Sequence, residues 1–242
     1  MMPGFDLDAI KFGTDSATFE RAIVLYESGK VTRFKRDPYE FSALVLGSKP
    51  YRVSVSIEHY DSGMCECYLG QTDTLCKHMV AVAIHAVKKG KPLSEHDKER
   101  VDIPQCSGKL GTLSDKKLTE TKNAITDALR YIKSYTGPSR TWFTYQDSLS
   151  GGCTRLAAIV SDLPVSAQTA KLLIDLLLRL ERKLMGGVDD SDGTVGECMT
   201  AIVEVLQEYA ELDHACIREF ATLQKLGDTS FGWEEPLVNL LE

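Results

Sequence analysis

Four residues that can bind a metal ion lie close together in the first half of the sequence. Cys65 and Cys67 are separated by one residue, and after eight further residues Cys76 and His78 repeat that spacing. Three thiolates and one imidazole form the closed, four-coordinate ligand set of a structural zinc site, which leaves no coordination position for a substrate. The pattern therefore predicts one structural Zn²⁺ bound by Cys65, Cys67, Cys76 and His78.

Two other interpretations of these four residues, core cysteines and a reactive or disulfide-bonded pair, account less well for their spacing. Free cysteines are common in protein cores, but two pairs of ligand-type residues with the same one-residue gap are rare by chance. The residues between the pairs include Gly70 and Asp73, which are typical of a turn rather than of a core. A disulfide or reactive pair formed by Cys65 and Cys67 would be strained. Zinc binding remains the favoured interpretation.

The elements upstream of these residues are predicted as one helix followed by three strands. Apolar residues recur at helical spacing over residues 15–29, behind an N-cap at Asp15 or Ser16. Segments 30–36, 41–47 and 51–60 are rich in β-branched and aromatic residues and are separated by turn sequences. This order predicts an antiparallel sheet of three strands.

The second pair of metal ligands is expected at the start of a helix. Thr74 is a candidate N-cap for a helix that begins near Leu75, which would place Cys76 in the first turn, where the helix dipole favours a thiolate. His85 lies two turns after His78 on the same helix face. A packed histidine is more common in such a position than a further ligand, and we interpret His85 in that way.

The pattern C-x-C followed by C-x-H resembles the SWIM-type zinc finger. The resemblance extends to the upstream segments FERAIVLYESGKV and SALVLGSKPYRVSVSI and to the helix CKHMVAVAIHAV, so it covers about residues 15–90. The zinc tail of the preprotein translocase motor is a near neighbour, but its last two ligands are adjacent, whereas Lys77 separates them here. The resemblance implies binding to DNA or protein, as in the transposases and chromatin-remodelling ATPases that carry the finger, and implies no catalytic activity.

The second half of the chain is predicted to be helical. Residues 90–115 have the Gly, Pro, Ser and charge content of a linker. Helical periodicity follows over residues 117–135, 165–185 and 194–213, and Thr194 and Glu197 have the spacing of a capping box. We therefore predict an α+β fold made of two domains. They are a SWIM-type zinc-finger domain at residues 1–100, with its core at about 15–90 and a three-stranded antiparallel sheet flanked by helices, and an acidic all-α domain at residues 115–242.

Charge is divided unevenly between the two predicted domains. Residues 1–100 contain 14 basic and 14 acidic residues, whereas residues 101–242 contain 14 basic and 21 acidic residues, so the net charge of −7 belongs to the second half. An acidic domain is a poor ligand for a polyanion. Binding of nucleic acid would therefore need a local basic patch.

One basic cluster in the sequence is a candidate for such a patch. Lys30, Arg33, Lys35 and Arg36 lie around Phe34. Clustered cations neutralise phosphates, and an aromatic ring can stack on a base. The alternative is an edge strand that its charges keep soluble, and this is the more common role of such a cluster.

Two segments of the helical half are candidates for further sites. Arg140 and Trp142 lie in an aromatic segment after a helix break, and residues of these types anchor partner proteins when they are exposed, although such clusters more often pack between helices. Asp189, Asp190 and Asp192 suggest a cation site, but the register of an EF-hand fails. Their charges are better explained by the N-terminus of the following helix.

Composition places the chain among globular proteins, with 43% hydrophobic and 26% charged residues. The N-terminal residues lack the features of a secretory signal, and no segment has the length of apolar sequence that a membrane helix needs, so we expect a cytoplasmic protein with no membrane contact. The favoured function is a non-enzymatic, zinc-binding module that recognises protein or DNA through residues 30–60 and 77–89. The alternative is an accessory or regulatory subunit, or an enzyme with its site in the helical domain, where the sequence shows no catalytic motif.

Overall fold

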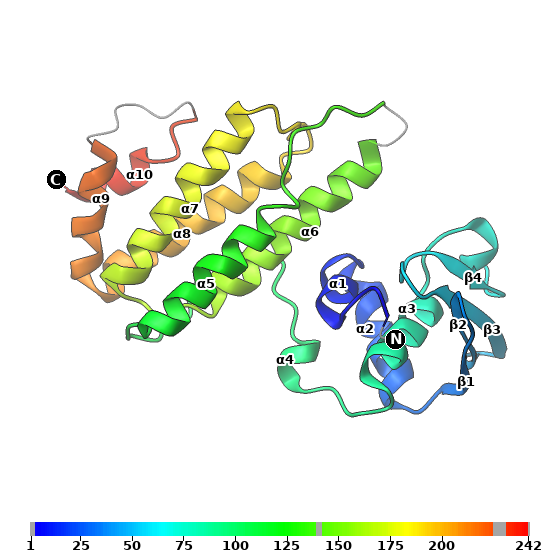
Figure 1. Ribbon diagram of the computed structural model, residues 1–242. Coiled ribbons are helices and arrows are strands. Elements are labelled where there is room, and N and C mark those ends of the chain that lie inside the picture. The colour runs from blue at the N-terminus through cyan, green and yellow to red at the C-terminus, as the bar shows by residue number, and fades with distance from the viewer. Residues whose placement is uncertain (1–2, 139–141, 225–230, 242) are drawn as a thin grey trace. The chain divides into compact units, whose positions relative to one another are not determined.

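The strands belong to the first hundred residues and the remainder is helical in the computed structural model, which describes residues 3–138, 142–224 and 231–241. The chain divides into two compact units, Met1–Arg100 and Val101–Glu242 (Figure 1). Each unit has its own hydrophobic core. The fold is α+β, and among the described residues no helix combines the length and the apolar character needed to cross a membrane.

The first unit contains a four-stranded antiparallel sheet in the order β1-β2-β3-β4. The strands are β1 (Val31–Arg36), β2 (Glu40–Leu46), β3 (Pro50–Ser56) and β4 (Gly63–Cys65). The prediction of three strands was therefore incomplete. Strand β4 was missed because three residues are too few to show an alternating pattern, and its place is set by pairing with β3, where Val53 lies opposite Cys65.

Strand β1 is interrupted by a bulge. Its pairing with β2 shifts between Thr32 and Lys35, and Arg33 lies inside the irregular region with a φ of 51°. This left-handed conformation is uncommon for a residue with a side chain and favours glycine or asparagine. The bulge changes which faces the following residues occupy, and this matters for the basic cluster described below.

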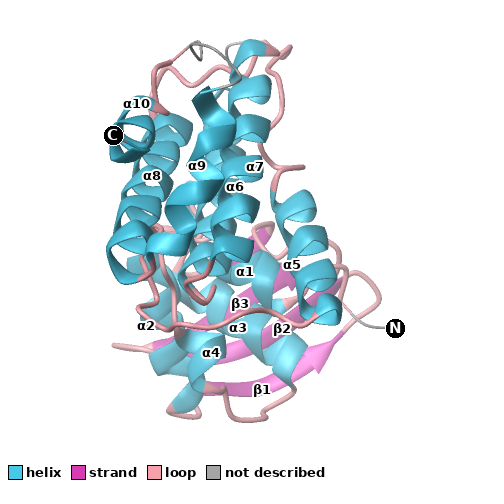
Figure 2. Ribbon diagram, turned by 90° about the vertical axis from the view of Figure 1, so that its left-hand side faces the viewer, coloured by secondary structure: helices cyan, strands magenta, loops and turns pink. Residues whose placement is uncertain are grey.

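Helices cover one face of the sheet (Figure 2). They are α1 (Leu7–Phe12), α2 (Ser16–Glu27) and α3 (Lys77–Lys88). Helix α3 packs against α1, α2, β2 and β3, and its residues from His78 to Ile84 are all buried. Because most of this helix is core, it offers little of the recognition surface that we predicted for residues 77–89.

The predicted linker of residues 90–115 contains the boundary between the two units, which falls after Arg100. Helix α4 (Glu95–Lys98) is held to the first unit, where Lys88 on α3 forms a 2.7 Å ion pair with Asp97. Later residues join the second unit, since Leu110 forms a bridge with Val165. Within the same segment, Ser94 forms the capping box of α4.

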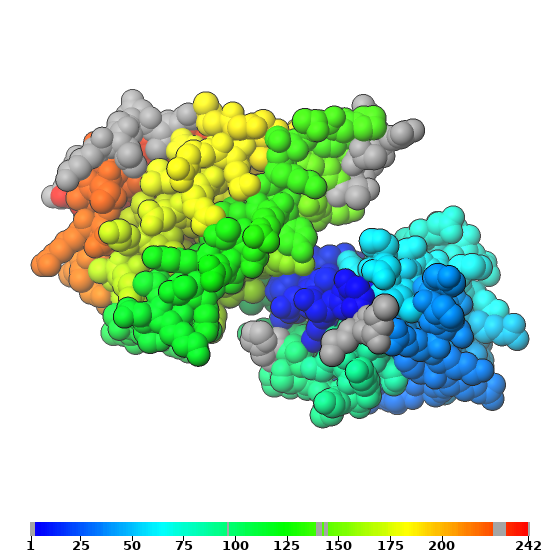
Figure 3. Space-filling view, viewed as in Figure 1, coloured from blue at the N-terminus to red at the C-terminus, as the bar shows by residue number. Residues whose placement is uncertain are grey.

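The second unit is helical. Its longer helices are α5 (Asp115–Ala128), α6 (Trp142–Ser161), α7 (Ala167–Met185), α8 (Thr194–Leu212) and α9 (Ile217–Gln224), followed by the short α10 (Glu235–Val238). Helix α8 packs against both α6 and α7. Helices α5 and α7 both reach the face seen in Figure 3. A 3.0 Å hydrogen bond joins them, which Arg179 on α7 donates to the hydroxyl of Thr126 on α5.

Helix α6 was not predicted, because its middle contains Gly151 and Gly152, which are unfavourable in an isolated helix. The packing explains Gly152. A Cβ atom at this position would lie 2.8 Å from the side chain of Ile132, so only glycine allows the chain after α5 to approach α6 this closely. Most of the aromatic segment that follows the predicted helix break thus belongs to a twenty-residue helix.

Candidate metal centre

The four predicted metal ligands come together in the first unit. Cys65 ends strand β4, and Cys67 follows it by two residues. Cys76 is the N-cap residue of α3, and His78 lies in the first turn of that helix. All four side chains are buried. The group therefore joins the last strand of the sheet to the helix that covers it.

The distances within the group match a tetrahedral metal site. One ligand atom from each residue lies within 4.8 Å of every other. The Nδ1 atom of His78 is 3.7 Å from the sulfur of Cys65 and 3.9 Å from that of Cys76. With Zn–S bonds of about 2.3 Å and Zn–N bonds of about 2.1 Å, a tetrahedron has S···N edges of about 3.6 Å. The side chains present thus fit a metal ion of this size.

The orientation of the His78 ring identifies the nitrogen that faces the sulfurs. Nδ1 approaches the cysteines, whereas the ring lies against Tyr51 with 4.6 Å between the centroids. On the other side, a Cβ atom at Gly47 would lie 3.1 Å from Nε2. Tyr51 and Gly47 thus hold the ring so that Nδ1 is the ligand atom.

A tight turn positions the first two cysteines. The backbone N–H of Cys67 points to the sulfur of Cys65 at 3.5 Å, and that of Gly70 points to the sulfur of Cys67 at 3.4 Å. Such N–H groups stabilise thiolates. Gly70 passes so close to the backbone of Cys65 that a Cβ atom there would lie 2.4 Å from the carbonyl oxygen of Cys65. The turn therefore requires glycine at position 70.

The thiols of Cys65 and Cys76 shift each other's pKa in opposite directions. A hydrogen bond from the Cys65 thiol lowers the pKa of Cys76 to about 4, and this effect outweighs burial, which acts in the opposite direction. The same interaction, together with burial, raises the pKa of Cys65. A bound cation would hold both sulfurs as thiolates, because metal ligands bind in the deprotonated form.

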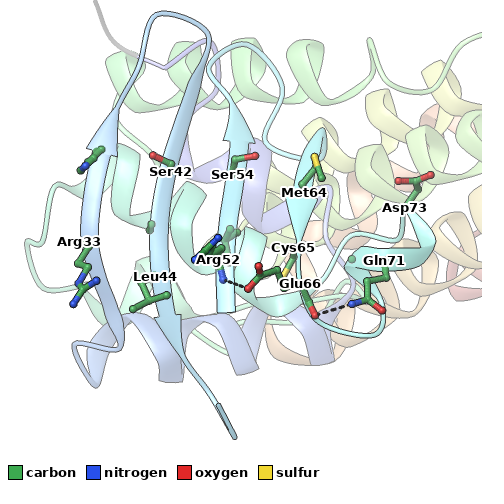
Figure 4. Close-up of a pocket in the computed structure, with 14 residues that line it drawn as sticks. Arg33, Ser42, Leu44, Arg52, Ser54, Met64, Cys65, Glu66, Gln71 and Asp73 are labelled. Carbon is green, nitrogen blue, oxygen red and sulfur yellow. Dashed lines mark hydrogen bonds between the residues drawn. The ribbon is translucent and has the colours of Figure 1, made fainter. Parts of the chain in front are cut away.

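Glu66, between the first two cysteines, is fixed to the sheet. Its carboxylate accepts a 3.0 Å hydrogen bond from the backbone N–H of Arg52 on β3, and its carbonyl oxygen accepts one of 3.2 Å from the side chain of Gln71 (Figure 4). These two bonds hold the turn from both ends. The roles of Arg52, Glu66 and Gln71 were not predicted from the sequence, since they depend on which residues of β3 and β4 lie opposite each other.

Helix α3 begins later than predicted. The expected cap was Thr74, but Cys76 occupies the N-cap with extended backbone angles. Thr74 instead directs its hydroxyl to the turn, toward the carbonyl oxygen of Thr72 at 3.3 Å. The sulfur of Cys76 still lies at the helix N-terminus, where the helix dipole favours a thiolate.

His85 takes no part in the metal centre. Its ring packs against Phe34, with 4.6 Å between the centroids, and against Tyr26 at 5.8 Å. Burial lowers the pKa of His85. Phe34 also stacks on Phe41 at 5.7 Å, so this ring belongs to the core side of the sheet and is not presented to a base.

Strand alternation divides the basic cluster between the two faces of the sheet, and the bulge sets which residues take which face. Lys35 lies opposite Ser42, on the face opposite α1, α2 and α3, and Arg33 (labelled in Figure 4) borders the same hollow as Lys35. Arg36 lies opposite Phe41 and holds its guanidinium 6.0 Å from the centre of that ring. Lys30 is exposed just before the strand. Binding of nucleic acid by these residues stays a prediction.

Of the two candidate anchors of a partner protein, Trp142 lies within the described residues. Arg140 lies outside the described residues. Trp142 begins helix α6, is partly buried, and donates a 3.0 Å hydrogen bond from its indole to Asp189. Contact of either residue with a partner remains a prediction.

The acidic segment before α8 caps that helix. The carboxylate of Asp190 accepts hydrogen bonds of 2.7 Å from the backbone of Val195 and 2.9 Å from that of Gly196. This agrees with the interpretation that these charges serve the helix N-terminus. The predicted capping box does not form, because Gly193 is the N-cap and no side chain of that residue can fill the role of Thr194.

No protein-family model matches the chain, and neither curated proteins nor solved structures give a match. Evidence on function therefore comes from the residues and their geometry.

Proposed function

We propose that the first unit is a SWIM-type finger in which Cys65, Cys67, Cys76 and His78 bind one structural Zn²⁺, and that the protein acts as a non-enzymatic interaction module. The observation that carries the proposal is the set of three sulfurs and one imidazole nitrogen within 4.8 Å of one another, all buried. Thiolate-rich sets of this kind favour Zn²⁺ over the harder cations Mg²⁺ and Ca²⁺.

The arrangement supports a structural role for the metal rather than a catalytic one. Catalytic zinc sites keep a coordination position open for water or substrate, whereas four protein ligands fill the tetrahedron. Cys76 and His78 are only 1% and 5% exposed, so a substrate would have little access to the metal. The metal would instead fix the turn between β4 and α3.

A protein partner is favoured over DNA as the molecule recognised. The first unit is neutral by residue count and the second carries the whole net charge of −7, so long-range attraction to a polyanion is absent. The bulge leaves Arg33 and Lys35, but not Arg36, on the uncovered face of the sheet. A short basic patch of this kind suits a local contact with a protein better than the backbone of a duplex.

Metal content tests the proposal. Protein purified without chelator should contain one zinc per chain by elemental analysis, and Co²⁺ in its place should give the absorption bands of a tetrahedral thiolate complex. Cys76→Ser should abolish both signals. Cys106→Ser, in the second unit, is the matched control and should retain them. Zinc-free protein with an intact fold, or Co²⁺ bands that persist in Cys76→Ser, would refute the assignment.

Chelation should act on one unit only. Structural zinc contributes folding free energy to the domain that binds it, and the two units have separate cores. EDTA should therefore remove the strand signal in circular dichroism while the helical signal of residues 101–242 persists. Loss of both signals in one transition would show that the units fold as one.

A further inference from the structure

The face of the sheet opposite the helices is lined by two rows of side chains (Figure 4). Strand pairing sets both rows, because residues opposite each other on neighbouring strands point to the same face. One row is Lys35, Ser42, Ser54 and Met64, from β1 to β4, and the other contains Leu44 and Arg52 with Glu66 beyond them. We call this surface, with Arg33 and Asp73 at its two ends, the open face.

The open face is hollowed. Its residues line a depression with a volume of about 730 Å³, which is the size of a ligand site. Leu44 and Met64 supply an apolar floor, and Met64 is 73% exposed. A methionine this exposed on a folded surface is a common feature of sites that accommodate a partner's side chains.

Three cations border this hollow without an ionic partner. No carboxylate of the described residues lies within 4.0 Å of the charged groups of Arg33, Lys35 or Arg52. Glu66 is near Arg52, but its carboxylate is engaged by the backbone N–H of that residue. The hollow therefore presents positive charge that the chain itself does not neutralise.

Negative groups flank the three cations on two sides. Glu66 and Asp73 border the hollow beyond β3, whereas Asp37 and Glu40, at the turn between β1 and β2, border an adjoining hollow of about 540 Å³. A continuous phosphate backbone leaving the three cations would meet these carboxylates. None of the described residues that line the first hollow has an aromatic ring on which a base could stack. A ligand with a few carboxylates and some apolar side chains suits this distribution better than a nucleic acid.

The backbone conformation of Arg33 is an independent indication that its side chain takes part in binding. A non-glycine residue at a φ of 51° is strained, and such strain is concentrated at functional sites. The strained conformation places the guanidinium beside the hollow. Glycine or asparagine would relieve the strain but would remove the charge.

We propose that the open face binds an extended acidic segment of a partner protein, with its carboxylates on Arg33, Lys35 and Arg52 and its apolar side chains on Leu44 and Met64. The inference rests on the proposed function, since it names the partner of the interaction module. Guanidinium groups bind carboxylates through paired, charge-assisted hydrogen bonds. The four strands span about 14 Å, a distance that about four extended residues cover.

The metal centre forms one wall of this site. Cys65 and Gly70 border the hollow, and the clamp between Glu66 and Arg52 joins the turn to β3. Metal binding and recognition therefore share the same short segment of chain. Binding of the acidic segment should require the metal-loaded protein.

The test uses zinc-loaded, full-length protein and three fluorescent probes. The first is a peptide of about eight residues that alternates Asp and Leu, which matches the extended length of the hollow with some excess. The second alternates Lys and Leu, and the third is oligothymidylate. We expect fluorescence anisotropy to show binding of the Asp-Leu peptide only, weakening as salt increases.

Matched variants locate the site. Lys35→Glu and Arg52→Glu should each weaken binding of the Asp-Leu peptide at least about tenfold, since each removes a charge-assisted contact. Lys30→Glu changes the same charge in the same sequence cluster but lies off the open face, and it should bind like the parent. Lys35→Gln and Arg52→Gln provide milder versions if a charge reversal disturbs folding.

The outcomes separate this inference from the proposed function. Absence of peptide binding at low salt in protein that contains zinc overturns the inference and leaves the metal assignment standing. Equal weakening by Lys30→Glu, or tighter binding of oligothymidylate that Lys35→Glu abolishes, also overturns it. Zinc content, measured on every variant, reports separately on the metal site.

Discussion

The backbone N–H of Arg52 donates a 3.0 Å hydrogen bond to the carboxylate of Glu66, the residue between two of the metal-site cysteines. Arg52 therefore contributes both to the metal-site turn and to the open face. Its main chain fixes the turn that carries Cys65 and Cys67, while its side chain borders the hollow of the open face. A change in the conformation of the turn should therefore alter the position of Arg52 on the sheet.

Removal of this carboxylate should weaken the metal site without touching a ligand. We expect Glu66→Ala to lower the affinity for Zn²⁺ about tenfold, because groups that position ligands typically contribute this much. Competition with a chromophoric chelator measures the change. Asp61→Ala, an exposed carboxylate outside the turn, is the control and should bind zinc like the parent. Unchanged affinity in Glu66→Ala would show that the cysteines position themselves.

Replacement of Arg33 should separate stability from binding. Asparagine tolerates the left-handed conformation better than arginine, so Arg33→Asn should raise the free energy of unfolding of the first unit by about 0.5 to 1 kcal/mol. The same variant should bind the acidic peptide more weakly. Urea unfolding and anisotropy measure the two effects. The control Lys35→Asn, at a regular strand position, should lower stability, since asparagine is unfavourable in strands.

The ion pair between Lys88 and Asp97 should make stability depend on pH. Burial alone would raise the pKa of Asp97, but hydrogen bonds from Lys88 and Ser94 dominate and lower it from 3.8 to about 2. A carboxyl whose pKa is depressed on folding stabilises the fold above its unfolded value of 3.8 and loses this contribution as the pH falls toward 2. Asp97→Asn should therefore cost about 1 kcal/mol at neutral pH, after allowance for solvent screening.

The difference between parent and Asp97→Asn should shrink as the pH falls from 4 to 2. Acid also protonates the metal ligands, but this affects both proteins and cancels in the difference. Glu95→Gln is the control, because Glu95 is 92% exposed and its ion pair with Lys98 should contribute little. A difference that stays constant with pH would assign the effect of Asp97 to its neutral hydrogen bonds.

The N-terminus of α8 allows a test of which residue caps it. Asp190→Ala should destabilise the second unit by about 1 to 2 kcal/mol, because two backbone N–H groups lose their acceptor. Thr194→Ala should have little effect, since this side chain forms no cap in the structure. Thermal unfolding of both variants measures the contrast. A larger destabilisation by Thr194→Ala than by Asp190→Ala would instead support the capping box that the spacing of Thr194 and Glu197 suggested.

Features that depend on local spacing could be predicted from the sequence. The pairs Cys65 with Cys67 and Cys76 with His78 indicated a metal site, and the structure places all four side chains together. Identification of the metal as zinc and of the protein as a SWIM-type finger rests on that pattern and remains a proposal. Alternation along β3 also indicates that Arg52 points away from the face on which Val53 is buried.

Features that depend on contacts distant in sequence could not be predicted. Strand β4 exists because it pairs with β3, and α6 tolerates Gly152 because Ile132 packs against it. The bulge at Arg33 is a property of the backbone that sequence alternation does not show, and it sets which face of the sheet Lys35 and Arg36 each occupy. Likewise, Asp190 reaches the start of α8 only after the loop before it has folded.

The spacing of the metal ligands also bears on the order in which the chain folds. Cys65 and His78 are thirteen positions apart, so closure of this loop costs little chain entropy compared with the pairing of more distant segments. Yet the loop joins a strand to the helix on which the sheet packs. Metal binding would therefore give the growing structure an early nucleus at the junction of β4 and α3, from which β3, β2 and β1 can add in turn.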